Sequence, residues 1–188
     1  MAESTVVHDF ILYTDGSGRE LDGYSGYAAL AKTPDNLVKR FVMGAMTEST
    51  VDRAEFTALI EGLRICWEMW ERFPNKGLRR EGVVRPKPKI KWYSDRENLV
   101  LAVKRVYDRS NQPDLWAAFE YFENLMEIDA QSVTEPFTDT DPSFVEVDLQ
   151  SSTLRQVIQA YTKNTPLTID VQPKPSRRKA AKTDSQDK

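Results

Sequence analysis

The stretch Ile11-Leu12-Tyr13-Thr14-Asp15-Gly16-Ser17-Gly18 is the part of this 188-residue chain that most constrains its fold. A run of residues that favour β-strands ends in an acid, and glycine follows at once. Glycine lets a backbone turn sharply or approach a neighbour closely. The stretch therefore predicts a buried strand that carries a carboxylate at its tip.

Two further acids occupy comparable places. Glu55 lies in the first turn of a segment with helical periodicity, and Asp95 directly follows the apolar run 90–94. Taken singly, each acid has an ordinary structural explanation: Asp15 as a turn former, Glu55 as a favourable charge at a helix N-terminus, and Asp95 as a helix cap. Three carboxylates delivered by separate elements suit a divalent-metal site better than a chance surface group.

The composition is typical of one globular domain with a sizeable core. Apolar residues make up 40% of the chain, and all four tryptophans fall within 67–116. No apolar run approaches the length of about 18 residues that a membrane span needs, and the polar N-terminus predicts no secretory signal.

The chain has one cysteine, Cys66, and one histidine, His8. This count excludes an internal disulfide and fits a reducing, cytoplasmic or otherwise intracellular location. It also excludes a zinc site built from cysteine and histidine. Any metal would be held by oxygen, which favours Mg²⁺ or Mn²⁺.

The formal net charge of −3 is unevenly distributed. Blocks at 76–91 and 174–182 are rich in lysine and arginine, whereas acids dominate 114–148. The basic blocks are compatible with local contacts to nucleic acid. Solvated loops that keep a protein soluble have the same composition, and that interpretation is the simpler one.

Hydrophobic periodicity predicts the element order β-β-β-α-β-α-α-β-α. Strands are expected over 6–14, 23–31, 37–43, 90–94 and 130–137, and helices over 52–72, 97–107, 113–126 and a last segment through 154–161. Residues 144–148 are expected to precede that last helix. An irregular linker is expected over 74–89.

This order predicts an α/β fold with a mixed five-stranded sheet and helices on both faces. The first strand and the strand over 90–94 would lie side by side and parallel, each ending in an acid. The domain is expected to span 1–168. Residues 169–188, rich in proline, lysine and arginine, predict a disordered basic tail.

Four short motifs follow one another along the chain. They are Thr14-Asp15-Gly16-Ser17, the helical stretch Arg53-Ala54-Glu55-Phe56-Thr57-Ala58-Leu59, the pair Ser94-Asp95, and Asp114-Leu115-Trp116. In their order and spacing they resemble ribonuclease H of type 1, over about residues 6–161. The resemblance implies the ribonuclease H-like fold.

It also implies a metal-dependent endonuclease that hydrolyses the RNA strand of RNA–DNA hybrids. Asp15, Glu55 and Asp95 would be catalytic, metal-binding carboxylates around two Mg²⁺ or Mn²⁺ ions. The family's fourth acid precedes the last helix, where Asp148 is the best positional match. Glu146 and Asp141 are rivals for that role.

Contacts with nucleic acid are expected at Gly16, Ser17, Arg53 and Arg96. Several positions nevertheless depart from the family. Its asparagines before the Arg-Ala-Glu motif are Val51-Asp52 here, its serine after the second aspartate is Arg96, and its usual histidine is missing from the later part of the chain.

An aspartate near phosphates would repel them. Two alternatives to hybrid cleavage therefore stay open. One is a nuclease of the same fold that acts on branched DNA or on RNA. The other is a non-catalytic module that binds nucleic acid or protein.

Overall fold

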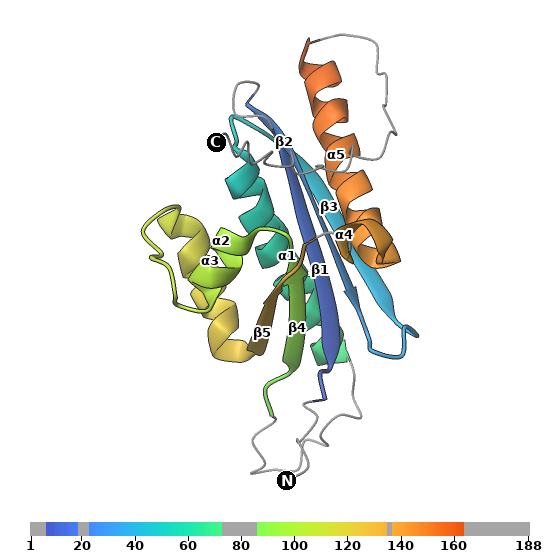
Figure 1. The fold of residues 1–188 in the computed structure, drawn as a ribbon, viewed down its shortest axis with the longest axis vertical. Coiled ribbons are helices and arrows are strands. Elements are labelled where there is room, and N and C mark those ends of the chain that lie inside the picture. The colour runs from blue at the N-terminus through green and yellow to red at the C-terminus, as the bar shows by residue number, and fades with distance from the viewer. Residues whose placement is uncertain (1–6, 19–22, 73–85, 135–136, 164–188) are drawn as a thin grey trace, which may run out of the picture.

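A computed structural model describes residues 7–18, 23–72, 86–134 and 137–163 of the chain. Its centre is a five-stranded sheet in the order β3-β2-β1-β4-β5 (Figure 1). The strands are β1 (Phe10–Gly18), β2 (Tyr24–Lys32), β3 (Lys39–Thr47), β4 (Lys89–Ser94) and β5 (Glu127–Ser132). β1 pairs antiparallel with β2 and parallel with β4, and β5 pairs parallel with β4. The predicted mixed sheet is therefore confirmed.

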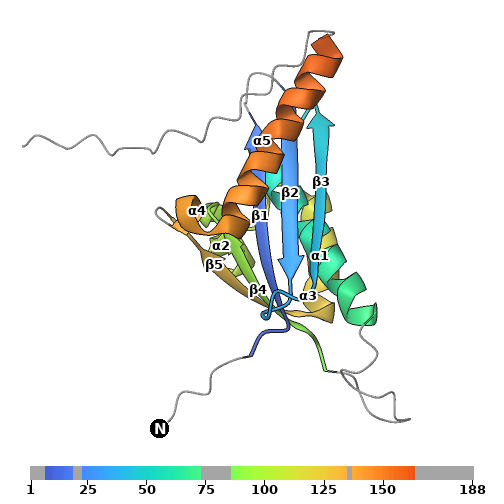
Figure 2. The same cartoon turned by 90° about the vertical axis from the view of Figure 1, so that its right-hand side faces the viewer.

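Helices cover both faces of this sheet (Figure 2). One face carries α1 (Val51–Arg72), α2 (Glu97–Val103) and α3 (Pro113–Leu125), whose apolar side chains share one buried cluster with Leu12 and Trp92. The opposite face carries α4 (Phe137–Thr140) and α5 (Pro142–Lys163), which enclose a smaller cluster around Tyr13.

Alternate residues of β1 face opposite helix layers, as the period of two in a strand requires. Leu12 belongs to the core under α1, and Thr14 accepts a hydrogen bond of 2.9 Å from the Trp92 indole on that face. Tyr13 and Asp15 point the other way, where Tyr13 packs against Phe144 of α5. The acid of β1 is thus placed toward α5.

Two glycines let these helices approach the sheet beside Asp15. A Cβ atom on Gly16 would lie 2.4 Å from the Glu55 backbone nitrogen, and one on Gly26 would lie 2.1 Å from the Ser151 carbonyl oxygen. Both distances are far below van der Waals contact, so only glycine fits. As a result α1 and α5 rest directly on the strands at this point.

Two predicted boundaries near the site were wrong. β1 was expected to end at its acid, but it continues to Gly18 because the pairing with β2 extends through Gly18 and Ser25. The last helix was expected to follow residues 144–148, but α5 begins at Pro142 and contains them. Phe144 and Val147 are both buried in the cluster around Tyr13, which holds this first part of α5 against the sheet.

Other boundaries shift for local reasons. α2 ends at Val103, and Val106 is exposed rather than internal, because Arg105 adopts a positive φ of 60° that breaks the helix. β5 spans Glu127–Ser132 instead of 130–137, in register with the whole of β4. β3 spans Lys39–Thr47 instead of 37–43. The predicted tail and most of the basic linker lie outside the described residues.

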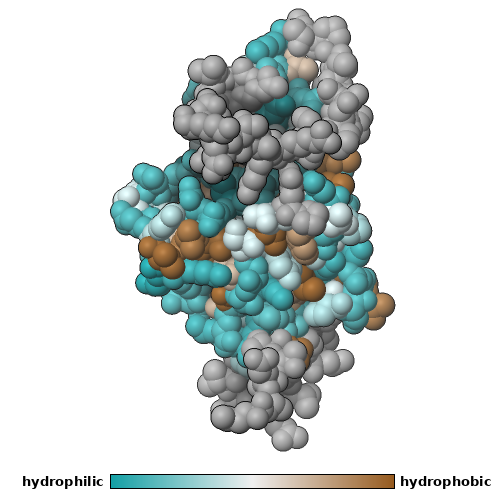
Figure 3. Space-filling view, in the orientation of Figure 1, coloured by the Kyte–Doolittle hydropathy of each residue, from teal (hydrophilic) through white to brown (hydrophobic). Residues whose placement is uncertain are grey.

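The face of the molecule that Figure 3 shows is mostly hydrophilic where its residues are described. In the view of Figure 3, apolar side chains form small groups separated by polar ones, which is normal for the outside of a folded domain. Within the part of the chain that the structure describes, no helix combines the length and apolar character needed to cross a membrane.

Candidate metal centre

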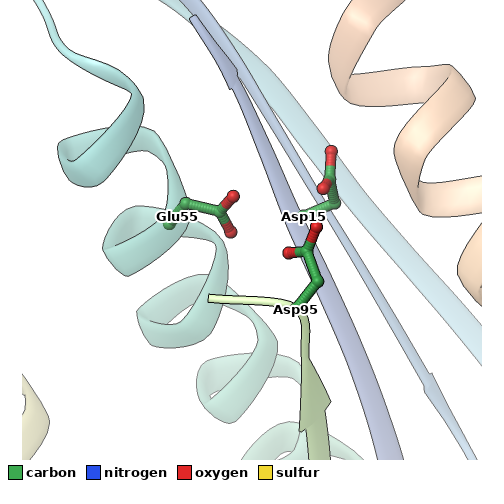
Figure 4. Close-up of side chains that lie close together, drawn as sticks. All are labelled: Asp15, Glu55 and Asp95. Atoms are coloured by element: carbon green, nitrogen blue, oxygen red, sulfur yellow. The ribbon is translucent and has the colours of Figure 1, made fainter. Parts of the chain in front are cut away.

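Three of the four predicted acids converge at the centre of the sheet. One carboxylate oxygen each from Asp15, Glu55 and Asp95 lies within 4.8 Å of the others. Figure 4 shows Glu55 reaching from α1 toward β1 and Asp95 rising from the end of β4 between the other two acids. Asp15 and Glu55 are buried, and Asp95 is exposed, so the cluster opens to solvent on the Asp95 side.

The strand pairing explains this convergence. β1 and β4 are parallel neighbours with Tyr13 opposite Tyr93, so Asp15 and Asp95 each follow two residues beyond that pair. Gly16 lets the first turn of α1 touch β1, and its N–H donates a hydrogen bond to the Glu55 carboxylate. The three acids are thus brought together by the pairing of β1 with β4 and by the packing of α1 on β1.

The electrostatics of Glu55 favour a cation. Burial raises the pKa of Glu55 well above its ordinary value, and the charges of Asp15 and Asp95 raise it further. The bond from Gly16 and the positive charge of Arg96 oppose this rise. The Oε2 atom of Glu55 is buried and has no hydrogen-bond partner among the described residues.

These features fit a hard divalent ion. A buried carboxylate oxygen without a partner is costly, and a bound cation would satisfy it. All three donors are carboxylate oxygens, which Mg²⁺ and Mn²⁺ prefer. The cluster can therefore hold a metal ion.

Solved structures share this architecture. The N-terminal RNase H domain of a Mycobacterium tuberculosis protein, solved as a fusion with maltose-binding protein, aligns with a TM-score of 0.62 over 82% of this chain and 97% of that one, at 15% identity. The chain has the ribonuclease H-like fold. RNase H1 from Halobacterium salinarum aligns with a TM-score of 0.56 at 15% identity, over 77% of this chain and 96% of that one.

A further match is LC11-RNase H1 in complex with an RNA/DNA hybrid, with a TM-score of 0.54 at 16% identity over 73% of this chain and 92% of that one. No protein-family model and no curated protein matches the sequence. At such low identity the likeness establishes the ribonuclease H-like fold and leaves the activity to be argued from the site.

The fourth predicted acid does not join the cluster. Asp148 lies half-buried within α5, outside the group formed by the three other carboxylates. Of its rivals, Glu146 is exposed, and Asp141 caps α5 by accepting the N–H of Ser143 at 2.8 Å. A metal-binding role for Asp148 stays a prediction.

One α5 residue that does meet the cluster is Ser151. Its hydroxyl donates a hydrogen bond to Oδ2 of Asp15. Sequence reasoning missed this residue, because a serine within an amphipathic helix has no distinctive pattern. The close contact at Gly26 helps to fix which side chain of α5 lies over Asp15.

The predicted nucleic-acid contacts lie around the same centre. Ser17 receives hydrogen bonds from Ser152 and from Nε of Arg155, each at 3.3 Å. Arg53 forms a two-pronged ion pair with Asp114.

Arg96 pairs with Asp52, so two departures from the family meet in space and neutralise each other. The Asp52 charge is therefore not an isolated source of repulsion. Contact of Arg96 and the other three residues with nucleic acid stays a prediction.

His8 lies away from the cluster. Its Nε2 is 3.2 Å from Oδ2 of Asp129 on β5. Asp15 lies seven positions further along the chain, most of them in β1, so at roughly 3.3 Å per residue about 20 Å of extended chain separates the two residues. Any acid–base chemistry at the cluster must use other groups.

Proposed function

We propose that the chain is a metal-dependent nuclease that hydrolyses the RNA strand of RNA–DNA hybrids. The observation that carries this proposal is the convergence of Asp15, Glu55 and Asp95 within 4.8 Å. The ribonuclease H-like fold supports it, and LC11-RNase H1, which shares that fold, was solved with an RNA/DNA hybrid bound.

Asp15, Glu55 and Asp95 would hold Mg²⁺ or Mn²⁺, with two ions expected. Such ions supply an activated water and offset the charge that develops on a phosphate during hydrolysis. The chain contributes rigid placement: Glu55 is buried and fixed by the Gly16 N–H, and Asp15 is fixed by Ser151. Because Asp95 is exposed, it marks the side from which a phosphate can reach the centre.

Arg53 and Arg96 would contact the substrate backbone. Both side chains are 39% exposed, and their partners Asp114 and Asp52 are 56% and 58% exposed. Ion pairs this exposed to solvent contribute at most about 1 kcal/mol, so a phosphate can replace the carboxylate. The planar guanidinium of arginine can form two parallel hydrogen bonds with a phosphate, whereas the lysine ammonium acts as a point charge.

Hydrolysis of a labelled hybrid in Mg²⁺ or Mn²⁺ tests the proposal. We expect cleavage of the RNA strand, and its loss in Asp15→Asn, which can still accept the Ser151 hydrogen bond. Glu71→Gln, an exposed position at the end of α1, is the matched control and should cleave normally.

Duplex RNA, single-stranded RNA and a four-way DNA junction complete the substrate set. Cleavage of the junction or of RNA alone would replace hybrid hydrolysis by another nuclease activity of this fold. If all substrates stay intact with both metals, the nuclease proposal is refuted.

A further inference from the structure

β3 is an edge strand without the usual features that keep an edge from pairing with another strand. It forms one border of the sheet (Figure 2), so every second residue directs its backbone N–H and C=O away from β2. Protected edge strands are short, or carry proline, charges or a bulge. β3 spans nine residues, pairs with β2 in unbroken register, and has no charge or proline from Phe41 to Thr47.

An apolar strip lies beside this open edge. Met43 is opposite Ala28, which belongs to the cluster around Tyr13, so Met43 faces the α5 side of the sheet. Phe41 and Ala45 face the same side, since side chains alternate along a strand. Although α5 contacts β3, Met43 remains 50% exposed and Ala45 is exposed as well. Burying this strip against a partner strand would be favourable.

The opposite border of the sheet is built differently. β5 has only six residues, and two of them are the acids Glu127 and Asp129. A short edge strand that carries charges resists pairing with another strand. Of the two borders of the sheet, β3 is therefore the one suited to accept a strand.

We infer that β3 is a self-association surface, and that its partner is the β3 edge of a second copy of this chain. A two-fold axis through Met43, the middle residue of the strand, allows all nine residues to pair antiparallel. Phe41 then lies opposite Ala45 of the second copy, and the two Met43 side chains meet at the axis. The two sheets become one continuous sheet with β5 at both borders.

The charges of β3 suit this antiparallel arrangement. Lys39 and Arg40 both lie at one end of the strand. Antiparallel pairing places Lys39 opposite Thr47 of the second copy. The two Lys39 residues are then eight steps apart, or about 26 Å, well beyond the screening length of about 8 Å at physiological salt. Parallel pairing would instead set equal charges side by side, so the strand is self-complementary in the antiparallel direction.

The pair is closed, and it leaves each carboxylate cluster accessible. Both β3 edges are used, and the remaining borders are the acid-bearing β5 strands, so growth stops at two copies. Asp15 lies in the same cross-strand row as Met43, through Ala28. Five strand spacings, about 24 Å, separate the two Asp15 backbones. The Asp95 side of each cluster lies at β4, across β1 from the shared edge.

Sedimentation equilibrium of the full chain, from micromolar to submillimolar concentration, tests this inference. We expect a monomer–dimer equilibrium, and hydrogen exchange of the 41–47 amides that slows as the concentration rises. Met43→Lys should weaken the dimer about tenfold or more, because two like charges meet at the two-fold axis. Met43→Glu should have the same effect for the same reason.

Mixing Met43→Lys with Met43→Glu should restore the dimer, because opposite charges then meet at the axis. Leu37→Lys is the matched control: it adds the same charge at a side chain that is 83% exposed in the connection before β3. It should change the dimer dissociation constant less than twofold. Circular dichroism shows whether each variant is folded, as expected for substitutions at exposed positions.

A wild type that stays monomeric over this concentration range would overturn the inference. A dimer that Met43→Lys leaves unchanged, or that Leu37→Lys weakens equally, would also overturn it. Failure of the two charged variants to pair when mixed would exclude a two-fold axis at Met43. None of these outcomes depends on hydrolysis, so the nuclease proposal is tested separately.

Discussion

Replacing Glu55 by glutamine should stabilise the metal-free protein at neutral pH. Glu55 is 4% exposed and shares its site with two other carboxylates within 4.8 Å. At an effective dielectric constant near 20, two unit charges at that separation repel by about 3.5 kcal/mol. Burial and this repulsion raise the pKa of the Glu55 carboxyl, so its ionisation costs free energy in the folded state.

The direction of the pH dependence follows from this raised pKa. Between the ordinary value of 4.5 and the raised pKa, the folded state binds a proton that the unfolded state has lost. The free energy of unfolding without metal therefore falls as pH rises through this range. At about 1.36 kcal/mol per pH unit, the loss at pH 7 is at most about 3.4 kcal/mol, and at pH 5 it is about 0.7 kcal/mol.

Glu55→Gln keeps the shape of the side chain and the acceptor for the Gly16 N–H, but removes the proton exchange. We expect a gain of about 1–3 kcal/mol at pH 7 in a chelator, or roughly 2–12 °C in Tm. The gain should nearly vanish at pH 5. Mn²⁺ should raise the Tm of the wild type and leave that of Glu55→Gln almost unchanged.

Thermal unfolding followed by circular dichroism at pH 5 and pH 7, with chelator or with Mn²⁺, measures all these effects. Glu71→Gln controls for the loss of an acid elsewhere on α1 and should change stability by less than about 0.5 kcal/mol. The reasoning fails if Glu55→Gln in chelator is no more stable than the wild type at pH 7, or gains as much at pH 5.

Three further substitutions test other parts of the account. Gly16→Ala places a Cβ 2.4 Å from the backbone nitrogen of Glu55, so it should lower the free energy of unfolding by about 2 kcal/mol or more and abolish the Mn²⁺-induced rise in Tm. A variant with the wild-type Tm and the wild-type response to Mn²⁺ would contradict this explanation. Trp92→Phe removes the donor to the buried Thr14 hydroxyl and should cost about 1–3 kcal/mol in urea unfolding, whereas an unchanged midpoint would show that this bond contributes nothing. Arg96→Ala should weaken hybrid binding in Ca²⁺ and reduce the slope of log K against log salt by about 0.9, as expected for one phosphate contact, and an identical slope would place Arg96 outside the interface.

Much of the fold could be predicted because its signals are local. The 22 residues of α1 carry a long apolar stripe, and β1 and β4 are apolar runs followed by acids. Parallel pairing of two such strands brings their acids together whatever the loops do. This is why Asp15, Glu55 and Asp95 could be named before their positions were known.

The α5 side of the site could not be predicted in the same way. Phe144 and Val147 suit the end of a loop as well as the start of a helix, and the boundary is decided by burial around Tyr13. Ser151 meets Asp15 where the absence of a Cβ atom on Gly26 lets α5 lie directly against the sheet. Gly26 and Ser151 are 125 positions apart in the sequence, so their contact leaves no periodic signal along the chain.

The pairing of Asp52 with Arg96 was missed for a related reason. Each residue alone is a departure from the family, and an aspartate at that place predicts repulsion of phosphate. The two are 44 positions apart, and their contact depends on how the start of α1 lies against the end of β4. A pattern along the chain carries no information on such a pair until the sheet is assembled.

The central claim is that Asp15, Glu55 and Asp95 together bind a divalent ion, and Mn²⁺ in a crystal of this protein tests it most directly. The account predicts an anomalous-scattering peak at bonding distance from a carboxylate oxygen of each of the three acids. A crystal grown at millimolar Mn²⁺ with no peak between these acids would contradict it.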